Sequence, residues 1–367
     1  MRTAIVSDLH LGSAFGEDLL RDAAIRRTLL EELVGAERLV LLGDVLELRE
    51  LPLAIALKSA KTFFEELGES MAGRPVVLVP GNHDHRLAEP LLERLALEGK
   101  PLDLEQHAEP AGDVATRIAA WLGDAELQIA YPGIWLRDDV YATHGHYMDC
   151  HMTLPRLECI AAAAAMRLLK PLPERTQPAD YERILRPVYG LTYGLAQGGV
   201  ARRAARPSER VWRSAIGSNG NRGRARRAAL RAAVPASIWG LNRLLRAEFN
   251  PSLSSQSISA SGIAAAAELA EHLDIRASHM LTGHTHRGGP WEGEAEWTLP
   301  NGGRLHNTGS WVFASAFHHP GTPPGPYWPG TVTWVEGDDP PRRSRLLLER
   351  PRDELRAAVA LLAATLA

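Results

Sequence analysis

The sequence predicts an α/β fold in layers, with two mixed sheets flanked by helices and a helical insertion. Two observations lead to this prediction. Short runs rich in Val, Leu and Ile recur along the 367 residues, and each ends in polar or glycine-bearing residues. Between the first three runs lie stretches with apolar residues at three- and four-residue spacing, which is typical of helices that cover a sheet.

The first three runs are TAIVSDLH, RLVLLGD and PVVLVPGNHD, and their length and composition suit strands that are buried on both faces. The helical stretches between them are EDLLRDAAIRRTLLEEL and ALKSAKTFFEELGESM. The later runs are VYATHGH, SHMLTGHTH, RLHNTGSWVF, TVTWVE and RLLLER, and they come without clear helices. This change favours a mixed or two-sheet core over a simple alternation of strand and helix.

The predicted strands divide the chain into a core and an insertion. Residues 1–149 and 274–350 contain all of these strands and are expected to form one catalytic domain. Residues 150–273 are rich in Ala and Arg, helical in pattern and broken by Pro and Gly, so we expect a helical cap there. Residues 351–367 have helical spacing and are expected to pack on the core as a C-terminal helix, with contact to a membrane surface as an alternative.

The insertion contains a cluster of arginines that is opposed by Glu209 alone. A run of like charges is most often a solvated helical face. This one could also bind substrate phosphates, nucleic acid or an anionic membrane surface. The cluster consists of Arg202, Arg203, Arg206, Arg210, Arg213, Arg222, Arg224, Arg226, Arg227 and Arg231.

The overall composition is that of an ordinary globular protein. A net charge of -3 gives no general attraction to nucleic acid or membranes. The two cysteines, Cys150 and Cys159, cannot build a disulfide framework, so we expect a cytoplasmic location. We identify neither a signal peptide nor an apolar run long enough to span a bilayer.

Side chains that can bind metals follow several of the predicted strands. Because sites of parallel sheets form at the carboxyl ends of strands, we expect these side chains to meet. Asp8 and His10 are two residues apart, so on an extended chain both would point to one side. The full set is Asp8, His10, Asp44, Asn82, His83, His144, His146, His284 and His286.

The donor set of these residues favours transition metals. Carboxylates, an amide oxygen and several imidazoles without a thiolate argue against magnesium and against structural zinc of the cysteine type. Manganese fits best, and iron or zinc is an alternative. There are more ligands than one ion needs, so we expect two divalent ions that share a carboxylate, a recurring device for phosphoester hydrolysis.

The blocks DLH, GDVLE, GNHD, HG and GHTH, in this order, resemble the calcineurin-like metallophosphoesterase superfamily. The resemblance implies a metallophosphoesterase-type sandwich and hydrolysis of phosphoester or phosphoanhydride bonds by attack of a metal-held hydroxide on phosphorus. One metal would be bound by Asp8, His10, Asp44 and His286. Asp44 would bridge to a second metal bound by Asn82, His144 and His284. His83 would be the catalytic acid, and Asp84 would orient it.

The segments SDLHLG, HGHYMD and NTGSWV are similar to the branch that contains UDP-2,3-diacylglucosamine hydrolases, which cleave a pyrophosphate and carry a helical lid in the same region. Enzymes of that branch often have arginine at the position of His83. A histidine at this position is the form found in phosphoesterases in general. The substrate could therefore be a small-molecule or a lipid-linked phosphate. A nuclease or cyclic-nucleotide phosphodiesterase is a rival that we do not favour, and a non-catalytic scaffold is the rival outside enzymes.

The remaining histidines are more simply interpreted as structural. His85, His107 and His151 are expected to be surface or satisfied core residues, and His306 to be part of the sheet region. The roles of His146 and Asp149 stay open, because His146 could contact substrate and Asp149 could hydrogen-bond a ligand histidine or cap a helix.

Overall fold

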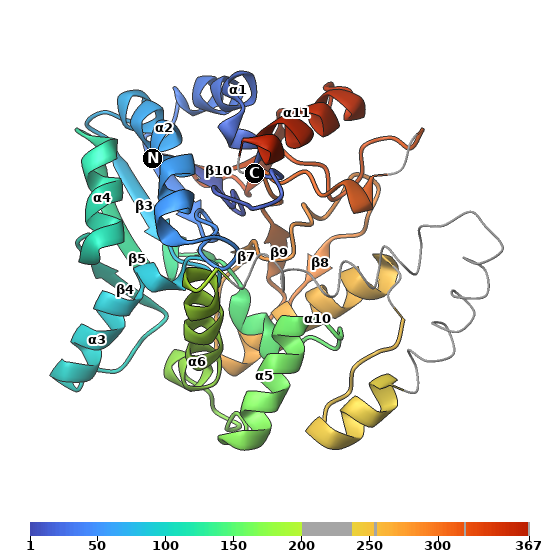
Figure 1. Ribbon diagram of the computed structural model, residues 1–367. Helices are drawn as coiled ribbons and strands as arrows, with labels where there is room; N and C mark the ends of the chain where they lie inside the picture. Colours follow the sequence, from blue (N-terminus) through green and yellow to red (C-terminus); the bar gives the residue numbers. More distant parts are fainter. Residues whose placement is uncertain (200–236, 253–254, 319–320, 366–367) are drawn as a thin grey trace.

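One continuous, strongly curled sheet forms the centre of the protein. The computed structural model describes residues 1–199, 237–252, 255–318 and 321–365, so the arginines between positions 202 and 231 lie outside the described residues (Figure 1). The strands are β1 (Arg2–Val6), β2 (Arg38–Leu42), β3 (Pro75–Val79), β4 (Glu105–Ala108), β5 (Glu126–Arg137), β6 (Val140–Thr143), β7 (His279–Thr282), β8 (Trp297–Thr298), β9 (Arg304–Asn307), β10 (Thr331–Glu336) and β11 (Arg342–Arg345).

The helices pack around this sheet. They are α1 (Ala23–Leu33), α2 (Leu53–Ser70), α3 (Glu89–Glu98), α4 (Gly112–Leu122), α5 (Leu157–Leu168), α6 (Pro178–Gln197), α10 (Ser255–His272) and α11 (Arg352–Ala364). Residues 237–245 are also helical. Short 3-10 helices are η1 (Leu19–Arg21), η2 (His85–Leu87), η3 (His146–Cys150) and η4 (Ser315–Phe317).

The long strand β5 divides the sheet into two halves. The strand order is β11-β10-β1-β2-β3-β5-β6-β7-β9-β8, and β4 pairs with β5 off this path. In the first half, β1, β2, β3 and the beginning of β5 run parallel, and β10 is antiparallel to β1. After Pro132, β5 pairs with β6 in the antiparallel sense, and β6, β7 and β9 run parallel. The two expected mixed sheets are therefore joined through β5.

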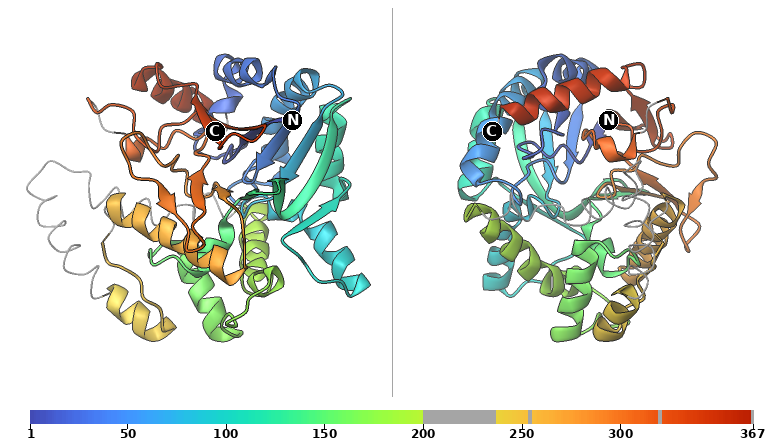
Figure 2. Two further views of the ribbon diagram at one scale, coloured as in Figure 1. Left: turned by 180° about the vertical axis from the view of Figure 1, so that it is seen from behind. Right: turned by 45° about the vertical axis from the view of Figure 1, so that its right-hand side comes forward.

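The continuous apolar runs reflect strands that are covered on both faces. In β2, Leu39 and Leu41 belong to the core that faces the helices of the first half, whereas Val40 and Leu42 belong to the core between the halves. The second half repeats this alternation, and Leu281 of β7 joins the core between the halves. The result is a four-layered sandwich, with helices outside each half and a shared apolar core inside (Figure 2).

Each half has its own set of outer helices. Helices α1, α2 and α4 pack on the first half, and Leu355 of α11 belongs to the same core. The outer face of the second half is covered by α5, α6, residues 237–245 and α10 (Figure 1). None of the helices in the described ranges has the length and apolar composition that a membrane crossing requires.

Hydrogen bonds join the two halves at the carboxyl ends of their strands. The backbone N–H of His284, after β7, donates to both carboxylate oxygens of Asp8, after β1, at 3.1 Å. The Trp311 N–H donates to the Asp8 carbonyl at 3.1 Å, and the hydroxyls of Ser7 and Thr308 lie 2.8 Å apart. The carboxyl ends of β1, β2, β3, β6 and β7 thereby surround one place.

One predicted strand is shorter than expected, and one observed strand was not predicted. The run RLLLER is a strand only at Arg345, and the chain turns over Leu346–Leu348, where the carbonyl of Leu347 accepts from the indole N–H of Trp328 at 2.8 Å. Strand β5 was not predicted, because Pro132 and Gly133 in its middle suggest a break. These two residues lie where β5 leaves β3 and begins to pair with β6.

Candidate metal centre

The seven predicted ligands come from five loops that follow five strands. Asp8 and His10 follow β1, and Asp44 follows β2. Asn82 follows β3, and His144 follows β6 directly. His284 and His286 follow β7. All of them except His286 are buried. The structure therefore brings all seven side chains to the junction of the two sheet halves.

Five of these residues have left-handed backbone conformations. Their φ angles are 55° at Asp8, 47° at His10, 50° at Asp44, 65° at His284 and 58° at His286. The expectation that Asp8 and His10 lie on an extended chain is wrong, because left-handed turns aim these side chains. Such conformations cost about 1–3 kcal/mol each outside glycine and gather at functional sites. The fold thus accepts backbone strain at this place.

The glycines beside the ligands allow close approach. A side chain on Gly43, whose φ is 82°, would place its Cβ 2.3 Å from Nδ1 of His144. A Cβ on Gly283 would lie 2.5 Å from a carboxylate oxygen of Asp8. Glycine is therefore required in the GD and GH blocks, because a predicted ligand from another loop occupies the space that a Cβ would need.

The first group of potential ligands consists of Asp8, His10 and His286. One ligand atom from each lies within 4.8 Å of the others. The Nε2 atoms of His10 and His286 are 3.0 Å apart, and Nε2 of His286 lies 3.3 Å from Oδ1 of Asp8. Three electron-donating atoms thus converge on one point, which suits a cation.

The second group consists of Asp44, His144 and His284, with Asn82 beside them. Nε2 of His144 lies 3.2 Å from Oδ2 of Asp44. The Asn82 amide can be placed in two orientations. In the first orientation the amide oxygen faces the group and lies 3.1 Å from Nδ1 of His284. In the second orientation the amide nitrogen faces the group and donates to Asp44 and His284, and the amide oxygen accepts from Arg49. Only the first orientation can ligate a metal.

A single oxygen of Asp44 faces both groups. Oδ2 lies 3.6 Å from Nε2 of His10 on one side and 3.2 Å from Nε2 of His144 on the other. Oδ1 is held separately, since it accepts the backbone N–H of His83 at 2.8 Å. The carboxylate is therefore fixed in a position from which one atom can be shared by two ions.

Outer hydrogen bonds set the tautomers of three ligand histidines. The Nδ1–H of His144 donates to the Leu42 carbonyl at 2.9 Å, so its Nε2 presents a lone pair to the centre. Nδ1 of His10 faces Glu47 at 3.0 Å, and Nε2 of His284 faces Asp149 at 2.9 Å. Acceptors on the far nitrogens are typical of histidines that ligate metals, and the residues present fit divalent ions with mixed nitrogen and oxygen ligands.

Glu47 is a buried site residue that was not predicted as such. Its Oε2 lies 2.6 Å from Nδ1 of His83 and 3.0 Å from Nδ1 of His10. The imidazoles outweigh the effect of burial and hold the pKa of the Glu47 carboxyl below its usual range. Its signal was present in the sequence, since Glu47 is the last residue of the block GDVLE.

Asp84 has contacts other than the expected one to the His83 ring. Its Oδ1 accepts the N–H of Gly81 at 2.7 Å, and its Oδ2 accepts the N–H groups of Val45 and Leu46 at 2.7 Å and 3.2 Å. Asp84 therefore ties the loop after β3 to the loop after β2. The His83 ring instead contacts Glu47 through Nδ1 at 2.6 Å, and its Nε2 lies 3.9 Å from Oδ2 of Asp44.

The electrostatic field of the centre favours cations. Burial lowers the pKa of His144, but the neighbouring Asp44 carboxylate outweighs it and raises the pKa to about 10. His10 behaves similarly, with its pKa raised to about 9, chiefly through Glu47. The pKa of Asp44 is held well below its usual range, because the imidazoles outweigh burial. These carboxylates are thus charged and aimed at a place that a cation would occupy.

A second polar cluster lies between the centre and the cap. His85 contacts Glu182 of α6 through Nε2 at 2.9 Å, and the hydroxyls of Tyr131 and Tyr147 donate to the same carboxylate. His146, whose role was open, contacts the Tyr131 hydroxyl at 3.0 Å. His85 is therefore a bonded core residue, as expected. His107, in contrast, is exposed and contacts Glu105 at 2.6 Å.

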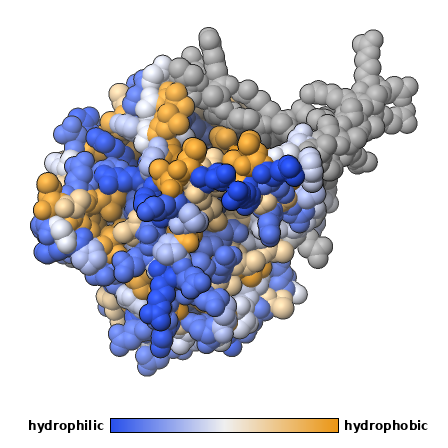
Figure 3. Space-filling model, turned by 90° about the horizontal axis from the view of Figure 1, so that it is seen from below, coloured by the Kyte–Doolittle hydropathy of each residue, from blue (hydrophilic) through white to orange (hydrophobic). Residues whose placement is uncertain are grey.

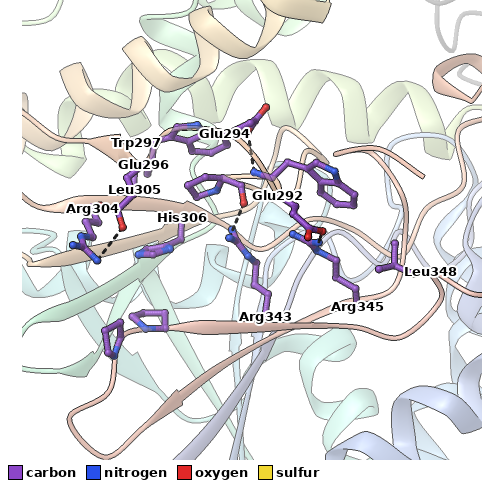
Figure 4. A pocket seen from close by; sticks show the side chains of 14 residues that line it. Glu292, Glu294, Glu296, Trp297, Arg304, Leu305, His306, Arg343, Arg345 and Leu348 are labelled. Atoms are coloured by element: carbon purple, nitrogen blue, oxygen red, sulfur yellow. Dashed lines mark hydrogen bonds and ion pairs between the residues drawn. The ribbon is translucent and has the colours of Figure 1, made fainter. Parts of the chain in front are cut away.

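A cavity of about 700 Å³ lies elsewhere, beside β8, β9 and β11 (Figure 4). Its lining includes Trp297, Arg304, Arg343, Arg345 and His306, and none of the predicted metal ligands. Nε2 of His306 lies 3.0 Å from Nδ1 of His279, and burial lowers the pKa of His306 to about 3. His306 is thus part of the second sheet half and separate from the metal centre.

A family model described as calcineurin-like phosphoesterase matches residues 1–184. The chain belongs to the calcineurin-like phosphoesterase family. It is therefore a metal-dependent phosphoesterase, and the matched segment contains the loops after β1, β2, β3 and β6. The loop after β7, with His284 and His286, lies beyond the match and completes the centre in space.

Comparisons beyond the family match are distant. No curated protein matches this phosphoesterase. One similar solved structure is a cold-active protein-tyrosine phosphatase of a psychrophile Shewanella sp., with 12% identity, 94% of this chain and 78% of that chain covered, and a TM-score of 0.29. Another is a dimetal phosphatase from Danio rerio, with 13% identity, coverage of 94% and 98%, and a TM-score of 0.34.

The contact between His85 and Glu182 should make stability depend on pH. Burial lowers the pKa of His85, but Glu182 outweighs it and raises the pKa to about 9. A raised folded-state pKa stabilises the protein below the unfolded value of about 6.5, and the effect is lost as pH rises through 9. We expect the destabilisation caused by His85→Gln to be on the order of 3 kcal/mol larger at pH 6 than at pH 9.

Urea unfolding of both proteins at pH 6, 7.5 and 9, at one metal concentration, measures this difference. The exposed His107→Gln variant is the control and should cost less than about 0.5 kcal/mol throughout. A destabilisation by His85→Gln that does not change with pH would show that the contact carries no charge.

Proposed function

We propose that this phosphoesterase binds two divalent ions and hydrolyses phosphoester or phosphoanhydride bonds. Asp8, His10, Asp44 and His286 bind one ion, and Asp44 bridges to the second. Asn82, His144 and His284 complete the second site. The mixed nitrogen and oxygen donors favour manganese, with iron or zinc as alternatives.

One observation carries this proposal: Oδ2 of Asp44 faces His10 and His144 from between them. A site for one ion would need the imidazoles on only one side of this oxygen. A carboxylate oxygen with imidazole nitrogens on both sides supports a pair of ions, which in hydrolytic sites lie about 3.5–4 Å apart.

The bound ions supply a nucleophilic hydroxide at neutral pH and positive charge for the phosphoryl oxygens. The chain supplies the proton for the leaving group. The His83 side chain is 21% exposed, and its Nδ1 is held by Glu47 at 2.6 Å, so its Nε2, which lies 3.9 Å from Oδ2 of Asp44, is the atom that can meet the leaving group. A proton on Nε2 can pass to the leaving oxygen. Burial lowers the pKa of His83, and the Glu47 carboxylate opposes this effect, so the proton is held weakly.

Arg49 joins α5 to the neighbourhood of Asn82. Its Nη2 donates to Glu158 of α5 at 3.2 Å. Its Nη1 donates to the Asn82 oxygen at 2.7 Å only when the amide nitrogen is turned toward the centre, so this contact is given up when Asn82 ligates a metal. We also propose that residues 1–149 and 274–350 act as the catalytic domain, residues 150–273 as the cap and residues 351–367 as a C-terminal helix. The free thiols of Cys150 and Cys159 support a cytoplasmic location.

Removal of the shared carboxylate should empty both sites. We expect Asp44→Ala to lower the metal content from about two ions per chain to fewer than one, because both ions lose a ligand. Inductively coupled plasma mass spectrometry after dialysis against a low manganese concentration measures the metal content. The exposed Asp113→Ala variant is the control and should keep both ions. Retention of two ions by folded Asp44→Ala would refute the shared-ligand assignment.

Removal of the proposed acid should affect turnover and leave the metals in place. We expect His83→Ala to lower kcat by about 10²–10⁴-fold with unchanged metal content. Hydrolysis of bis(p-nitrophenyl) phosphate with manganese, assayed beside His107→Ala, tests this. Loss of metal together with activity would instead make His83 a ligand, as its place near His10 and Asp44 allows.

A lipid-linked phosphate is a second candidate substrate, favoured by apolar side chains on the cap. The face that carries the cap helices shows hydrophobic patches (Figure 3). The exposed large apolar residues among residues 150–199 and 237–252 are Leu157, Leu168, Leu169, Leu191, Leu195, Trp239 and Leu244. Leu195 lies near the end of α6. Gln197, the last residue of this helix, accepts the backbone N–H of Leu53 at the beginning of α2. The apolar side chains at this end of α6 are therefore close to the proposed catalytic domain.

This substrate class can be tested with two substrates. We expect the double variant Leu191→Ser and Leu195→Ser to lower kcat/KM at least about tenfold for an acylated nucleotide-sugar pyrophosphate, because an acyl chain loses apolar contacts. Hydrolysis of bis(p-nitrophenyl) phosphate should be unchanged. Leu97→Ser, on exposed α3, is the control. Equal losses on both substrates would exclude specific recognition of the acyl chain by these residues.

A further inference from the structure

A second group of metal-binding side chains lies outside the catalytic centre. It consists of His151, which directly follows η3, and of Glu268 and His272 in the last turn and a half of α10. One ligand atom from each residue lies within 4.8 Å of the others. The group joins the residue that follows η3 to the end of α10.

The distances suit ligands of one ion. Oε1 of Glu268 lies 2.9 Å from Nδ1 of His151 and 3.9 Å from Nε2 of His272. In a tetrahedral zinc site with bonds of about 2.0–2.1 Å, neighbouring ligand atoms are about 3.3 Å apart, which lies between the two observed values. Glu268 and His272 are four residues apart, so they share one face of α10.

The hydrogen bonds of His272 point its free nitrogen into this group. The Thr176 hydroxyl donates its one proton to the Pro173 carbonyl at 2.8 Å. The contact of 3.0 Å between Thr176 Oγ1 and Nδ1 of His272 therefore has the imidazole as donor. Nε2 of His272 then presents a lone pair on the side of Glu268.

His151 also has a hydroxyl at its far nitrogen. Its Nε2 lies 2.7 Å from the hydroxyl of Tyr181, a fully buried residue of α6, and its Nδ1 faces Glu268. Each imidazole thus has its far nitrogen on a hydroxyl and its near nitrogen toward one carboxylate oxygen. Outer contacts of this kind orient histidines that ligate metals.

The group is open to solvent on one side. The side chain of His151 is only 3% exposed, whereas those of His272 and Glu268 are 27% and 51% exposed. An ion could therefore enter from solvent and keep water as a further ligand. Two imidazoles and one carboxylate are a ligand set that zinc uses in proteins.

We propose that His151, Glu268 and His272 bind a zinc ion that joins α10 to the loop after η3. The proposal is independent of the catalytic metals, because none of the three residues belongs to the centre around Asp44. The ion would connect the cap to the segment that contains His144 and Asp149. It would stabilise the attachment of the cap and take no part in hydrolysis.

Zinc binding to the full chain tests the proposal. The protein is first loaded with manganese, and zinc chloride is then titrated by calorimetry, with metal content measured after dialysis. We expect one zinc per chain in addition to the metals at the catalytic centre. His272→Ala and Glu268→Gln should each weaken this binding at least tenfold, whereas His107→Ala, at an exposed histidine beside Glu105, should leave it unchanged.

Two further results decide between the outcomes. Zinc should raise the Tm of the wild type by several degrees more than that of His272→Ala. In Asp44→Ala the additional zinc should persist, so failure of the catalytic assignment and failure of this proposal are distinguishable. Equal zinc binding by wild type, His272→Ala and Glu268→Gln would overturn the proposal and leave the three side chains as an ion-pair network.

Discussion

The position of the Asp44 carboxylate, at the junction of the two sheet halves, is the constraint on which the rest of the structure depends. One oxygen is fixed by the backbone of His83, and the other faces imidazoles from both halves. This arrangement is available only because the sheet curls at β5, so that the carboxyl ends of β2 and β6 meet. The apolar core between the halves, with Leu42 and Leu281, holds them together and thus sets the geometry of the site.

The centre combines several features that destabilise a fold without a cation. Five residues have left-handed backbones, and Asp8, Asp44 and Glu47 bring buried carboxylates close together. Imidazoles with raised pKa values compensate this negative charge in part. Divalent ions would compensate it more completely, because they interact with carboxylates and neutral imidazoles at once. Backbone strain and buried negative charge thus destabilise the metal-free centre, and both favour the binding of cations. The packed layers around the centre supply the stability that offsets this cost.

Much of this arrangement could be predicted from the sequence. Buried strands that end in Asp, Asn or His indicated which side chains come together, since strand ends of one sheet edge must meet. Strand β5 could not be predicted, because Pro132 and Gly133 suggest a break and the change of pairing partner is a tertiary effect.

The contacts of Asp84 and Glu47 could not be predicted from the sequence either. The resemblance implied that Asp84 orients His83, but the turn directs that carboxylate to backbone N–H groups of the loops after β2 and β3.

Helices α5, α6 and α10 are attached to neighbouring segments by the same kind of contact. Each of these three helices contributes a glutamate that contacts a basic side chain: Glu158 of α5 contacts Arg49, Glu182 of α6 contacts His85, and Glu268 of α10 contacts His151. Arg49 and His85 follow the loops that carry Asp44 and Asn82. Since partly buried ion pairs lose much energy when one partner is removed, these contacts fix the helices relative to the metal centre.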